Sequence, residues 1–422
     1  MASLMESFRS KVSKIKDTGI NRSAEFDVMY STGFLAIDYL NGTTVHVKSK
    51  DRNFSYNSVG VVDGSANTVI SRPSSGKSTL LTQIAGNLVR PFIKKGLPTG
   101  LYIDDIEGSL PEARKEFLLG LTREEIEEYV DIRNTGITTE NVFQRIQSIH
   151  EIKTKNRKDY EYDTGLYDTN GNRIFKLVPT LYLLDSLPML LPQDLSDDDE
   201  LGGSMSASSI AKNNTMLFKK IAQLCKEANI ILFTINHILE DINIGFLSKA
   251  AQISGLKQNE RLPGGRASIY LANNMFRLDD SLTLKDSEGF GINGSVVTIT
   301  LIKSRTNATK RSVPLIFNKT EGRFDEILSL FQLLKSEGRF KGAGAYLYLD
   351  GAPDVKFGQK NFKQQLETYP ELQKAFAQEC YSILSSYLSD TRSVRTNTST
   401  VSQNITDMIS SMSIIEEPVL VV

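Results

Sequence analysis

The residues 71–79, SRPSSGKST, combine glycine, serine and lysine in a spacing that can bind phosphate. An apolar, β-branched run at 66–70 precedes them, and a segment that can be helical follows at 78–89. In a strand–loop–helix of this kind, backbone N–H groups and the helix N-terminus surround the phosphates. The predicted nucleotide-binding residues are therefore Ser71, Arg72, Pro73, Ser74, Ser75, Gly76, Lys77, Ser78 and Thr79.

Within this loop, Lys77 is expected to contact the β- and γ-phosphates and the Ser78 hydroxyl to bind Mg²⁺. The usual pattern is G-x-x-x-x-G-K-S/T, and Ser71 replaces its first glycine. An ordinary strand–turn–helix with an exposed lysine is the alternative. The order of the flanking elements favours nucleotide binding, with ATP and Mg²⁺ as ligands.

Three other apolar segments end in polar side chains, at 100–105, 180–186 and 229–237. Helical segments separate the apolar runs, which predicts an α/β fold with a doubly wound, mostly parallel sheet. The carboxyl ends of parallel strands lie at one edge of such a sheet, where ligands bind. The polar residues expected at that edge, besides the loop, are Asp104, Asp105, Glu107, Asp185, Asn236 and His237.

These side chains suit nucleoside-triphosphate hydrolysis. Asp185 follows an apolar strand and can hold the Mg²⁺ shell, and Glu107 can orient and polarise the attacking water. Asn236 can report the γ-phosphate to a loop. Considered alone, Asp185 could instead be a carboxylate that caps a helix or stabilises a turn, and Glu107 could be a solvated charge in a loop. Because four such strand ends converge, the sequence favours an ATPase over these separate explanations.

Composition narrows the class of protein. The chain has 422 residues, 40% of them apolar and 23% charged, and a net charge of −1, so nucleic acid would have to bind at local basic clusters. It has no long apolar run and no N-terminal signal pattern, which predicts no membrane association. Cys225 and Cys380 lie far apart, which favours a reducing, cytoplasmic location over a disulfide framework. The spacing of three histidines and two cysteines argues against zinc.

The expected organisation has four parts: an N-terminal oligomerisation arm at 1–30, an ATPase core at 31–325, a mostly helical C-terminal domain at 326–390 and a flexible tail at 391–422. In the arm, apolar residues recur every fourth position, which is typical of an amphipathic helix. Such a helix could pack on a neighbouring subunit or, equally well, on its own domain. The polar residues 153–178 predict an inserted hairpin or loop, 110–127 a helix, and 269–280 a strand.

An ordered series of segments resembles the RecA-type DNA strand-exchange recombinases, in particular their phage UvsX-like branch. The segments are STGFLAIDYLNG, SRPSSGKST, YIDDIEGSLPEARKEFL, TLYLLDSLPMLLP, ILFTINH, LPGGRASIYLANNMFRL and TLIKSRTN. EGRFDEILSLFQLLKSEGRF also looks like the family's segment that leads into the C-terminal region. Each motif alone is common, and their order is the more specific feature.

The resemblance implies a RecA-like fold and an ATP-dependent DNA recombinase. A phage-encoded member of the UvsX-like branch would act in the cytoplasm of the host. Such a protein forms a helical filament on single-stranded DNA, with ATP between subunits, and pairs that strand with a homologous duplex. It acts in recombination, repair and recombination-dependent replication. A single-strand-binding protein and a mediator or loader are further partner classes that the resemblance leaves open.

Two carboxylates match family positions. Glu107 falls on the catalytic glutamate and Asp185 on the metal-shell aspartate. The local motif IDDIEG has one extra residue, so Asp104 and Asp105 remain alternatives to Glu107.

Four further polar residues match the family's coupling and interface positions. Asn236 and His237 fall on the pair that couples the γ-phosphate to DNA binding. Lys303 and Arg305 fall on a basic pair that reaches the neighbouring subunit's ATP site, where cations can stabilise charge as an arginine finger does. A solvated basic strand end is the alternative for this pair.

In this family two loops bind DNA, and here they correspond to about 189–209 and 238–266. The first is acidic at 194–200, which would repel a phosphate backbone and leaves its role open. The second has cations for phosphates, an aromatic ring for stacking and glycines for close backbone approach. Its predicted DNA-binding residues are Phe246, Lys249, Lys257, Arg261, Gly264, Gly265 and Arg266.

Two other functions fit parts of the sequence. A RecA-fold helicase would have the same ATPase residues but would form a closed ring. A non-catalytic DNA-binding paralogue would account for Ser71 in place of the loop's first glycine.

Overall fold

The computed structural model describes residues 28–48, 53–196, 205–240, 255–257, 259–265, 267–285, 290–343 and 346–390. The tail at 391–422 and nearly all of the predicted arm lie outside these residues, as do most of the acidic segment and Phe246, Lys249 and Arg266 of the predicted DNA loop.

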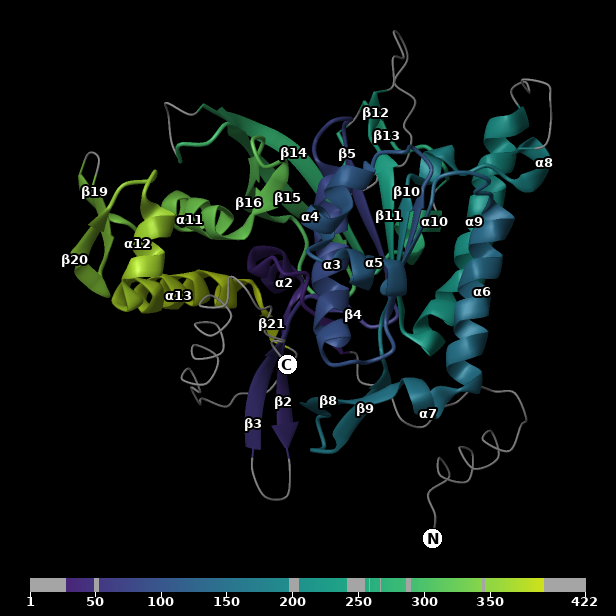
Figure 1. Ribbon diagram of the computed structural model, residues 1–422, viewed down its shortest axis with the longest axis horizontal. Coiled ribbons are helices and arrows are strands. Elements are labelled where there is room, and N and C mark those ends of the chain that lie inside the picture. The colour runs from purple at the N-terminus through teal and green to yellow at the C-terminus, as the bar shows by residue number, and fades with distance from the viewer. Residues whose placement is uncertain are drawn as a thin grey trace, which may run out of the picture.

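A nine-stranded sheet forms the centre of the molecule, in the order β17-β16-β15-β14-β5-β11-β10-β6-β7. Its strands are β5 (Ala66–Ser71), β6 (Gly100–Asp105), β7 (Val130–Arg133), β10 (Thr180–Asp185), β11 (Ile230–His237), β14 (Asn274–Leu284), β15 (Gly294–Ser304), β16 (Arg311–Asn318) and β17 (Arg323–Asp325). The six strands from β14 to β7 pair in parallel, and β14 to β17 pair antiparallel. The predicted α/β fold with a mostly parallel sheet is confirmed (Figure 1).

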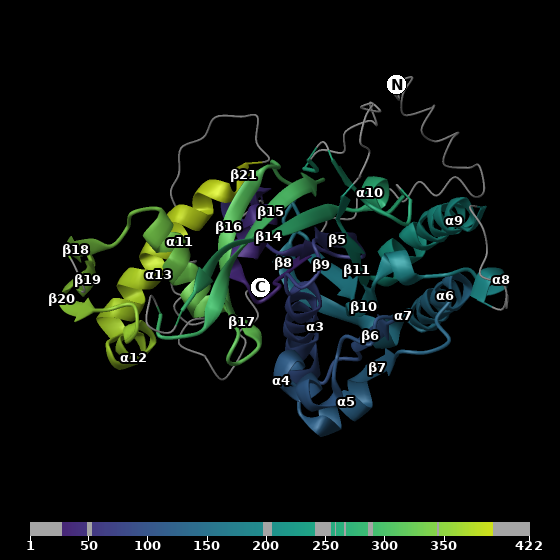
Figure 2. The same ribbon diagram turned by 90° about the horizontal axis from the view of Figure 1, so that it is seen from above.

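Helices cover both faces of this sheet. Every residue of β10 is buried, as expected of a central parallel strand. Leu181 and Leu183 join the apolar cluster that contains the α3 side chains, whereas Tyr182 and Leu184 join the cluster that contains those of α6 and α9. Figure 2 shows α3 on one face and α6 and α9 on the other. The helices of these two layers are α3 (Lys77–Lys94), α4 (Lys115–Leu119), α5 (Arg123–Tyr129), α6 (Thr139–Lys155) and α9 (Met205–Ala228).

Two sequence expectations need correction. The predicted helix at 110–127 is a short 3-10 turn (Glu112–Arg114) followed by α4 and α5. Gly120 ends α4 in the left-handed region, at a φ of 61°, and Thr122 starts α5 with a capping box. The predicted strand at 269–280 begins instead as helix α10 (Ala267–Leu271), and β14 starts only at Asn274.

The insertion at 153–178 folds mainly as a hairpin of β8 (Glu161–Tyr167) and β9 (Arg173–Leu177) after the short helix α7 (Arg157–Tyr160), as predicted. It packs against the hairpin of β2 (Thr43–Lys48) and β3 (Asn53–Ser58). Phe54 and Tyr167 meet edge to face at 5.6 Å, and the Tyr56 hydroxyl donates to the Tyr167 carbonyl at 2.9 Å. The insertion therefore braces the lower end of the molecule in Figure 1.

The C-terminal segment is less helical than expected, because it includes a three-stranded antiparallel sheet. An aromatic cluster joins its layers: Phe331 lies 4.6 Å from Phe362, which lies 5.1 Å from Phe357, between ring centroids. The elements are α11 (Glu326–Ser336), β18 (Lys341–Ala343), β19 (Tyr346–Leu349), β20 (Ala352–Phe357), α12 (Phe362–Thr368) and α13 (Pro370–Leu384). Their buried side chains belong to the same apolar cluster as α3. Among the described residues, every helix is too short or too polar to cross a bilayer.

Replacing Glu326 by glutamine should stabilise the fold at alkaline pH. The Leu35 N–H donates to Glu326 Oε1 at 2.8 Å, while Oε2 is buried without a hydrogen-bond partner among the described residues. Burial, with Asp38 and Asp325 nearby, raises the pKa of Glu326 from 4.5 to about 8. In the folded protein the Glu326 carboxyl keeps its proton up to about pH 8, whereas in the unfolded chain it loses the proton above about pH 4.5. The free energy of unfolding therefore falls as pH rises from about 4.5 to about 8. Glutamine keeps the acceptor and cannot ionise.

In urea unfolding, the Glu326→Gln variant should exceed the wild type by on the order of 2–4 kcal/mol at pH 8, and by no more than about 1 kcal/mol at pH 5. The exposed Glu337, at the end of the same helix, provides the control Glu337→Gln, which should track the wild type at both pH values. A wild-type stability that is equal at pH 5 and pH 8 would contradict a neutral, buried Glu326.

Candidate functional site

Four parallel strands end at the same edge of the sheet and bring their polar residues together. Asp185 at the end of β10 lies opposite Asp105 at the end of β6. His237 at the end of β11 lies opposite Ser71 at the end of β5. The loop at 71–79, the carboxylates after β6, Asp185 and the residues ending β11 are therefore neighbours.

The loop after β5, which is predicted to bind phosphate and is called the phosphate loop below, turns directly into helix α3. Ser74 and Gly76 have positive φ angles of 62° and 84°, and helix α3 begins at Lys77 directly after Gly76. A side chain at position 76 would be strained at this φ and would approach the Phe324 ring to 3.0 Å. The first N–H groups of an 18-residue helix thus face the loop, as anion binding requires.

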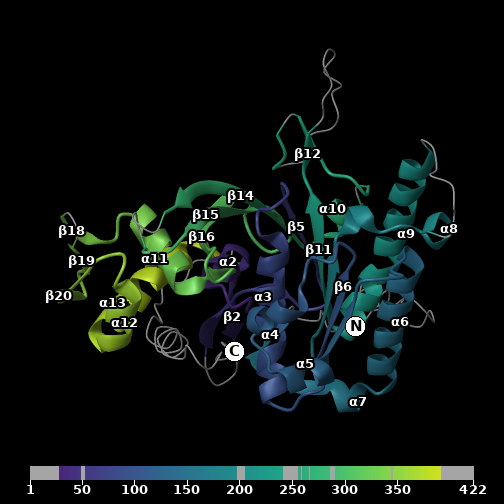
Figure 3. The same ribbon diagram turned by 45° about the horizontal axis from the view of Figure 1, so that its top comes forward.

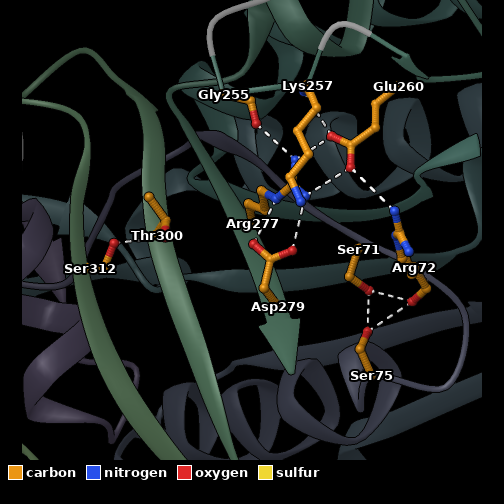
Figure 4. Close-up of polar contacts among 10 residues, drawn as sticks. All are labelled: Ser71, Arg72, Ser75, Gly255, Lys257, Glu260, Arg277, Asp279, Thr300 and Ser312. Carbon is orange, nitrogen blue, oxygen red and sulfur yellow. Dashed lines mark hydrogen bonds and ion pairs between the residues drawn. The ribbon is translucent and has the colours of Figure 1, made fainter. Parts of the chain in front are cut away.

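Ser71, which replaces the usual glycine, fits this loop without strain. It is the last residue of an extended strand and is not among the residues with positive φ. The Arg72 carbonyl accepts hydrogen bonds from the Ser71 hydroxyl at 2.7 Å and the Ser75 hydroxyl at 2.9 Å (Figure 4). It also accepts from the Lys77 ammonium at 2.9 Å. Three side chains of the loop therefore share one carbonyl acceptor, and Lys77 uses one of its three N–H donors on it.

Asp104 and Asp105, the two alternatives to Glu107, form contacts with other parts of the chain. Asp104 forms a buried ion pair with Arg145 at 2.6 Å. Asp105 accepts hydrogen bonds from the backbone N–H groups of Ser109 and Leu110, both at 2.9 Å. These contacts build the sheet and the turn after β6, which leaves Glu107 as the carboxylate facing the loop.

Glu107 lies between the ends of two neighbouring strands. Its Oε1 accepts from the Ser186 hydroxyl and lies 2.8 Å from His237 Nε2. Partial burial alone would raise the pKa of Glu107, but the hydrogen bonds from Ser186 and His237 and the charge of Lys77 outweigh it and hold the pKa below the usual value. The side chain remains 30% exposed. Glu107 is thus an ionised, oriented carboxylate with access to solvent.

Asp185 is buried beside the start of α3. Its Oδ2 accepts from the Ser109 hydroxyl at 3.0 Å, and its buried Oδ1 has no hydrogen-bond partner among the described residues. Burial raises the pKa of Asp185, and Ser78 lies close enough to oppose that shift. Burial also lowers the pKa of Lys77, against the attraction of Asp185 and Glu107.

This arrangement fits a hydrated Mg²⁺ held with phosphates. Mg²⁺ in proteins is usually bound by one or two carboxylates together with water and phosphate oxygens. The buried Oδ1 of Asp185 and the nearby Ser78 hydroxyl are oxygen groups of this kind. Within the described ranges, no group of three or more His, Cys, Asp or Glu side chains could hold a metal ion. Asp185 and Ser78 would therefore bind Mg²⁺ together with phosphate oxygens rather than as a closed protein site.

Asn236 links the end of β11 to the predicted DNA loop. It is fully buried, and its Nδ2 donates to the Pro263 carbonyl at 3.0 Å. Its Oδ1 accepts from the His237 N–H at 2.8 Å. The next residue, Ile238, donates its N–H to the Ser71 carbonyl at 2.9 Å. One short segment thus contacts Glu107, the phosphate loop and residues of the predicted DNA loop.

Four of the predicted DNA-binding residues lie within the described ranges. Lys257 and Arg261 are exposed. Gly264 and Gly265 have φ angles of 82° and 89°, and a Cβ at Gly265 would lie 3.1 Å from the Ala211 carbonyl oxygen of α9. These glycines allow close packing on α9, a role that the sequence analysis did not predict for them.

Lys303 and Arg305 lie at the opposite edge of the sheet from Lys77. Lys303 pairs through Met275 with the first half of β5, away from the loop that follows Ser71. The Lys303 ammonium donates to the carbonyls of Ile269, Tyr270 and Ala272 at 2.6 to 2.8 Å, which caps the C-terminus of α10. Burial, then the charge of Arg305, lowers the pKa of Lys303 to about 8. In one subunit these cations therefore do not meet the phosphate loop.

Cavities lie on two sides of the phosphate loop. One of about 250 Å³ is lined by Ser74, Gly76 and Lys319, among others, and one of about 600 Å³ by Arg72, Lys257 and other residues. Both cavities are lined by residues of the loop at 72–76, and none of the described residues Lys77, Glu107 and Asp185 lines either of them.

Sequence reasoning missed several residues of the site. Ser109, four residues after the end of β6, donates to Asp185 and was not predicted. Ser186, which ends the polar segment at 180–186 that the sequence did single out, donates to Glu107. Arg277 is charged yet lies within an apolar strand, which also marked it as unusual. No protein-family profile matches the chain, and a search of curated proteins found no match.

Proposed function

We propose that this protein is an ATP-dependent DNA recombinase with a RecA-like fold. It would polymerise on single-stranded DNA and catalyse homologous pairing and strand exchange. The observation that carries the proposal is the pair Asn236–His237: His237 contacts Glu107 at 2.8 Å, and Asn236 contacts the Pro263 carbonyl of the predicted DNA loop at 3.0 Å. Adjacent residues thus contact the candidate water-orienting carboxylate and the candidate DNA loop.

In this proposal ATP binds at the loop after β5. Lys77 contacts the phosphates, and Ser78 and Asp185 hold Mg²⁺, which supplies charge neutralisation when bound. Glu107 is ionised at neutral pH because of its lowered pKa, so it can accept a proton from, or orient, an attacking water. Ser186 and His237 hold its carboxylate in place.

DNA affinity would depend on the nucleotide through Asn236 and His237. A γ-phosphate near Glu107 changes what His237 can contact, and Asn236 carries that change to the Pro263 carbonyl. A ligand shifts such an equilibrium only by its differential affinity for the two states. ATP would therefore favour the DNA-bound state, and hydrolysis would release it.

The basic pair would act between subunits. Lys303 and Arg305 lie away from the phosphate loop of their own subunit, which supports a role at the ATP site of a neighbour in a helical filament. The partners are therefore single- and double-stranded DNA and further copies of this chain.

An ATPase assay with and without single-stranded DNA, with negative-stain imaging of the same mixture, tests the proposal. We expect DNA to raise the hydrolysis rate by about tenfold or more, since allosteric coupling typically spans 5- to 150-fold, and we expect helical filaments. An ATP hydrolysis rate that is the same with and without single-stranded DNA would contradict the recombinase proposal. Closed rings would indicate a helicase-type motor, and absence of turnover would indicate a non-catalytic DNA-binding protein.

A further inference from the structure

A buried ion network connects β14 to the base of the predicted DNA loop. Arg277 forms two contacts with Glu260, at 2.5 and 3.0 Å, and two with Asp279, at 2.7 and 2.9 Å. It also donates to the Gly255 carbonyl at 3.0 Å. Figure 4 shows Arg277 between the two carboxylates. The Glu260 side chain is fully buried, so this arginine fixes the place of Glu260.

Glu260 belongs to a small hairpin of β12 (Leu239–Glu240) and β13 (Glu260–Arg261), which closes the base of that loop. Glu240 and Glu260 lie directly opposite each other in the pairing. Like charges in this position destabilise a hairpin unless a cation lies between them. Figure 3 shows β12 beyond the ends of β5 and β11, on the side of the phosphate loop.

Arg72 of the phosphate loop supplies that cation. Its Nη2 lies 2.5 Å from Glu240 and 3.9 Å from Glu260. The side chains of Arg72 and Glu240 are 55% and 53% exposed, whereas those of Arg277 and Glu260 are buried, so the contact of Arg72 with Glu240 is the adjustable end of the network. The backbone of the same residue is the acceptor for Lys77, at 2.9 Å.

We propose that Arg72 is a positioning residue that transmits phosphate binding to the hairpin β12–β13. When Lys77 turns to a phosphate, the Arg72 carbonyl loses a charged donor and keeps the hydroxyls of Ser71 and Ser75, so the backbone that carries the Arg72 side chain can shift. The contact of Arg72 with Glu240 and Glu260 changes with it, and so does the base of the loop. This route rests on the proposed function and runs beside the one through Asn236.

The test uses the ratio of single-stranded DNA affinities with and without a non-hydrolysable ATP analogue. Glu240→Gln should lower this ratio about three- to fivefold, the range of an exposed ion pair, and leave DNA-independent hydrolysis within about twofold. In an Arg72→Gln background the same Glu240→Gln change should have no further effect. Asp350→Asn, which removes the acid of the exposed Lys341–Asp350 pair, is the matched control and should leave the ratio unchanged.

A reporter separates failure of this route from failure of the recombinase proposal. The chain has no tryptophan, so Leu239→Trp would place a single indole on β12. The ATP analogue should shift its emission, and Glu240→Gln should remove most of that shift, with no DNA present. An emission shift that is equal with and without Glu240→Gln would overturn the role of Arg72. A wild-type affinity ratio of one would contradict the recombinase, whatever the reporter shows.

Discussion

Replacing Glu107 by glutamine should lower the rate of ATP hydrolysis by at least about 100-fold while ATP still binds, since positioned general bases typically contribute 10²- to 10⁴-fold. Glutamine keeps the shape and can still accept from Ser186, but it cannot take a proton from water. The lowered pKa of Glu107 means that the wild-type carboxylate is already ionised at neutral pH. Because ATP would remain intact, DNA-bound filaments should persist longer than those of the wild type.

Single-turnover assays measure the rate of ATP hydrolysis, and equilibrium titration with an ATP analogue measures whether nucleotide binding is retained. Glu112→Gln is the control, because Glu112 lies on the same connection after β6 with a largely exposed side chain paired to Lys115. It should hydrolyse ATP at the wild-type rate. Full activity in Glu107→Gln would show that another group orients the water and would remove Glu107 from the catalytic residues.

Replacing Lys77 by alanine should abolish measurable turnover and weaken ATP binding by at least about tenfold, since hydrogen bonds to charged groups contribute about 1.5–3 kcal/mol. The Lys77 ammonium is buried, and within the described residues its hydrogen bond goes to the Arg72 carbonyl, so it is available to exchange that partner for a phosphate. Fluorescent-nucleotide titration and steady-state ATPase assays measure both effects.

The thermal stability of Lys77→Ala should stay within a few degrees of the wild type, because burial already lowers the pKa of Lys77 and its removal relieves that cost. This separates loss of binding from loss of folding. Lys95→Ala, which removes an exposed lysine just past the end of the same helix, should retain wild-type affinity. Unchanged ATP affinity in Lys77→Ala would contradict nucleotide binding at this loop.

Local sequence patterns determined the main elements of this protein. The apolar runs at 180–185 and 230–235 are buried central strands, and the loop that ends at Gly76 connects β5 to α3 in the predicted order, with Lys77 and Ser78 at the start of the helix. The convergence of polar residues also followed from sequence, because parallel strands deliver their ends to one edge. These features depend on neighbours a few residues apart, which a sequence pattern records directly.

The tertiary structure decided which of the polar residues lie in contact with one another. Glu107 was separated from Asp104 and Asp105 by contacts across the sheet, such as that with His237, 130 residues away. The network of Arg72, Glu260 and Arg277 likewise joins three separate segments. Hydrogen bonds and burial set the charge and orientation of a carboxylate, and both depend on groups that only folding brings close. For that reason the sequence predicted where the candidate site lies, and only the folded structure shows which of its residues contact one another.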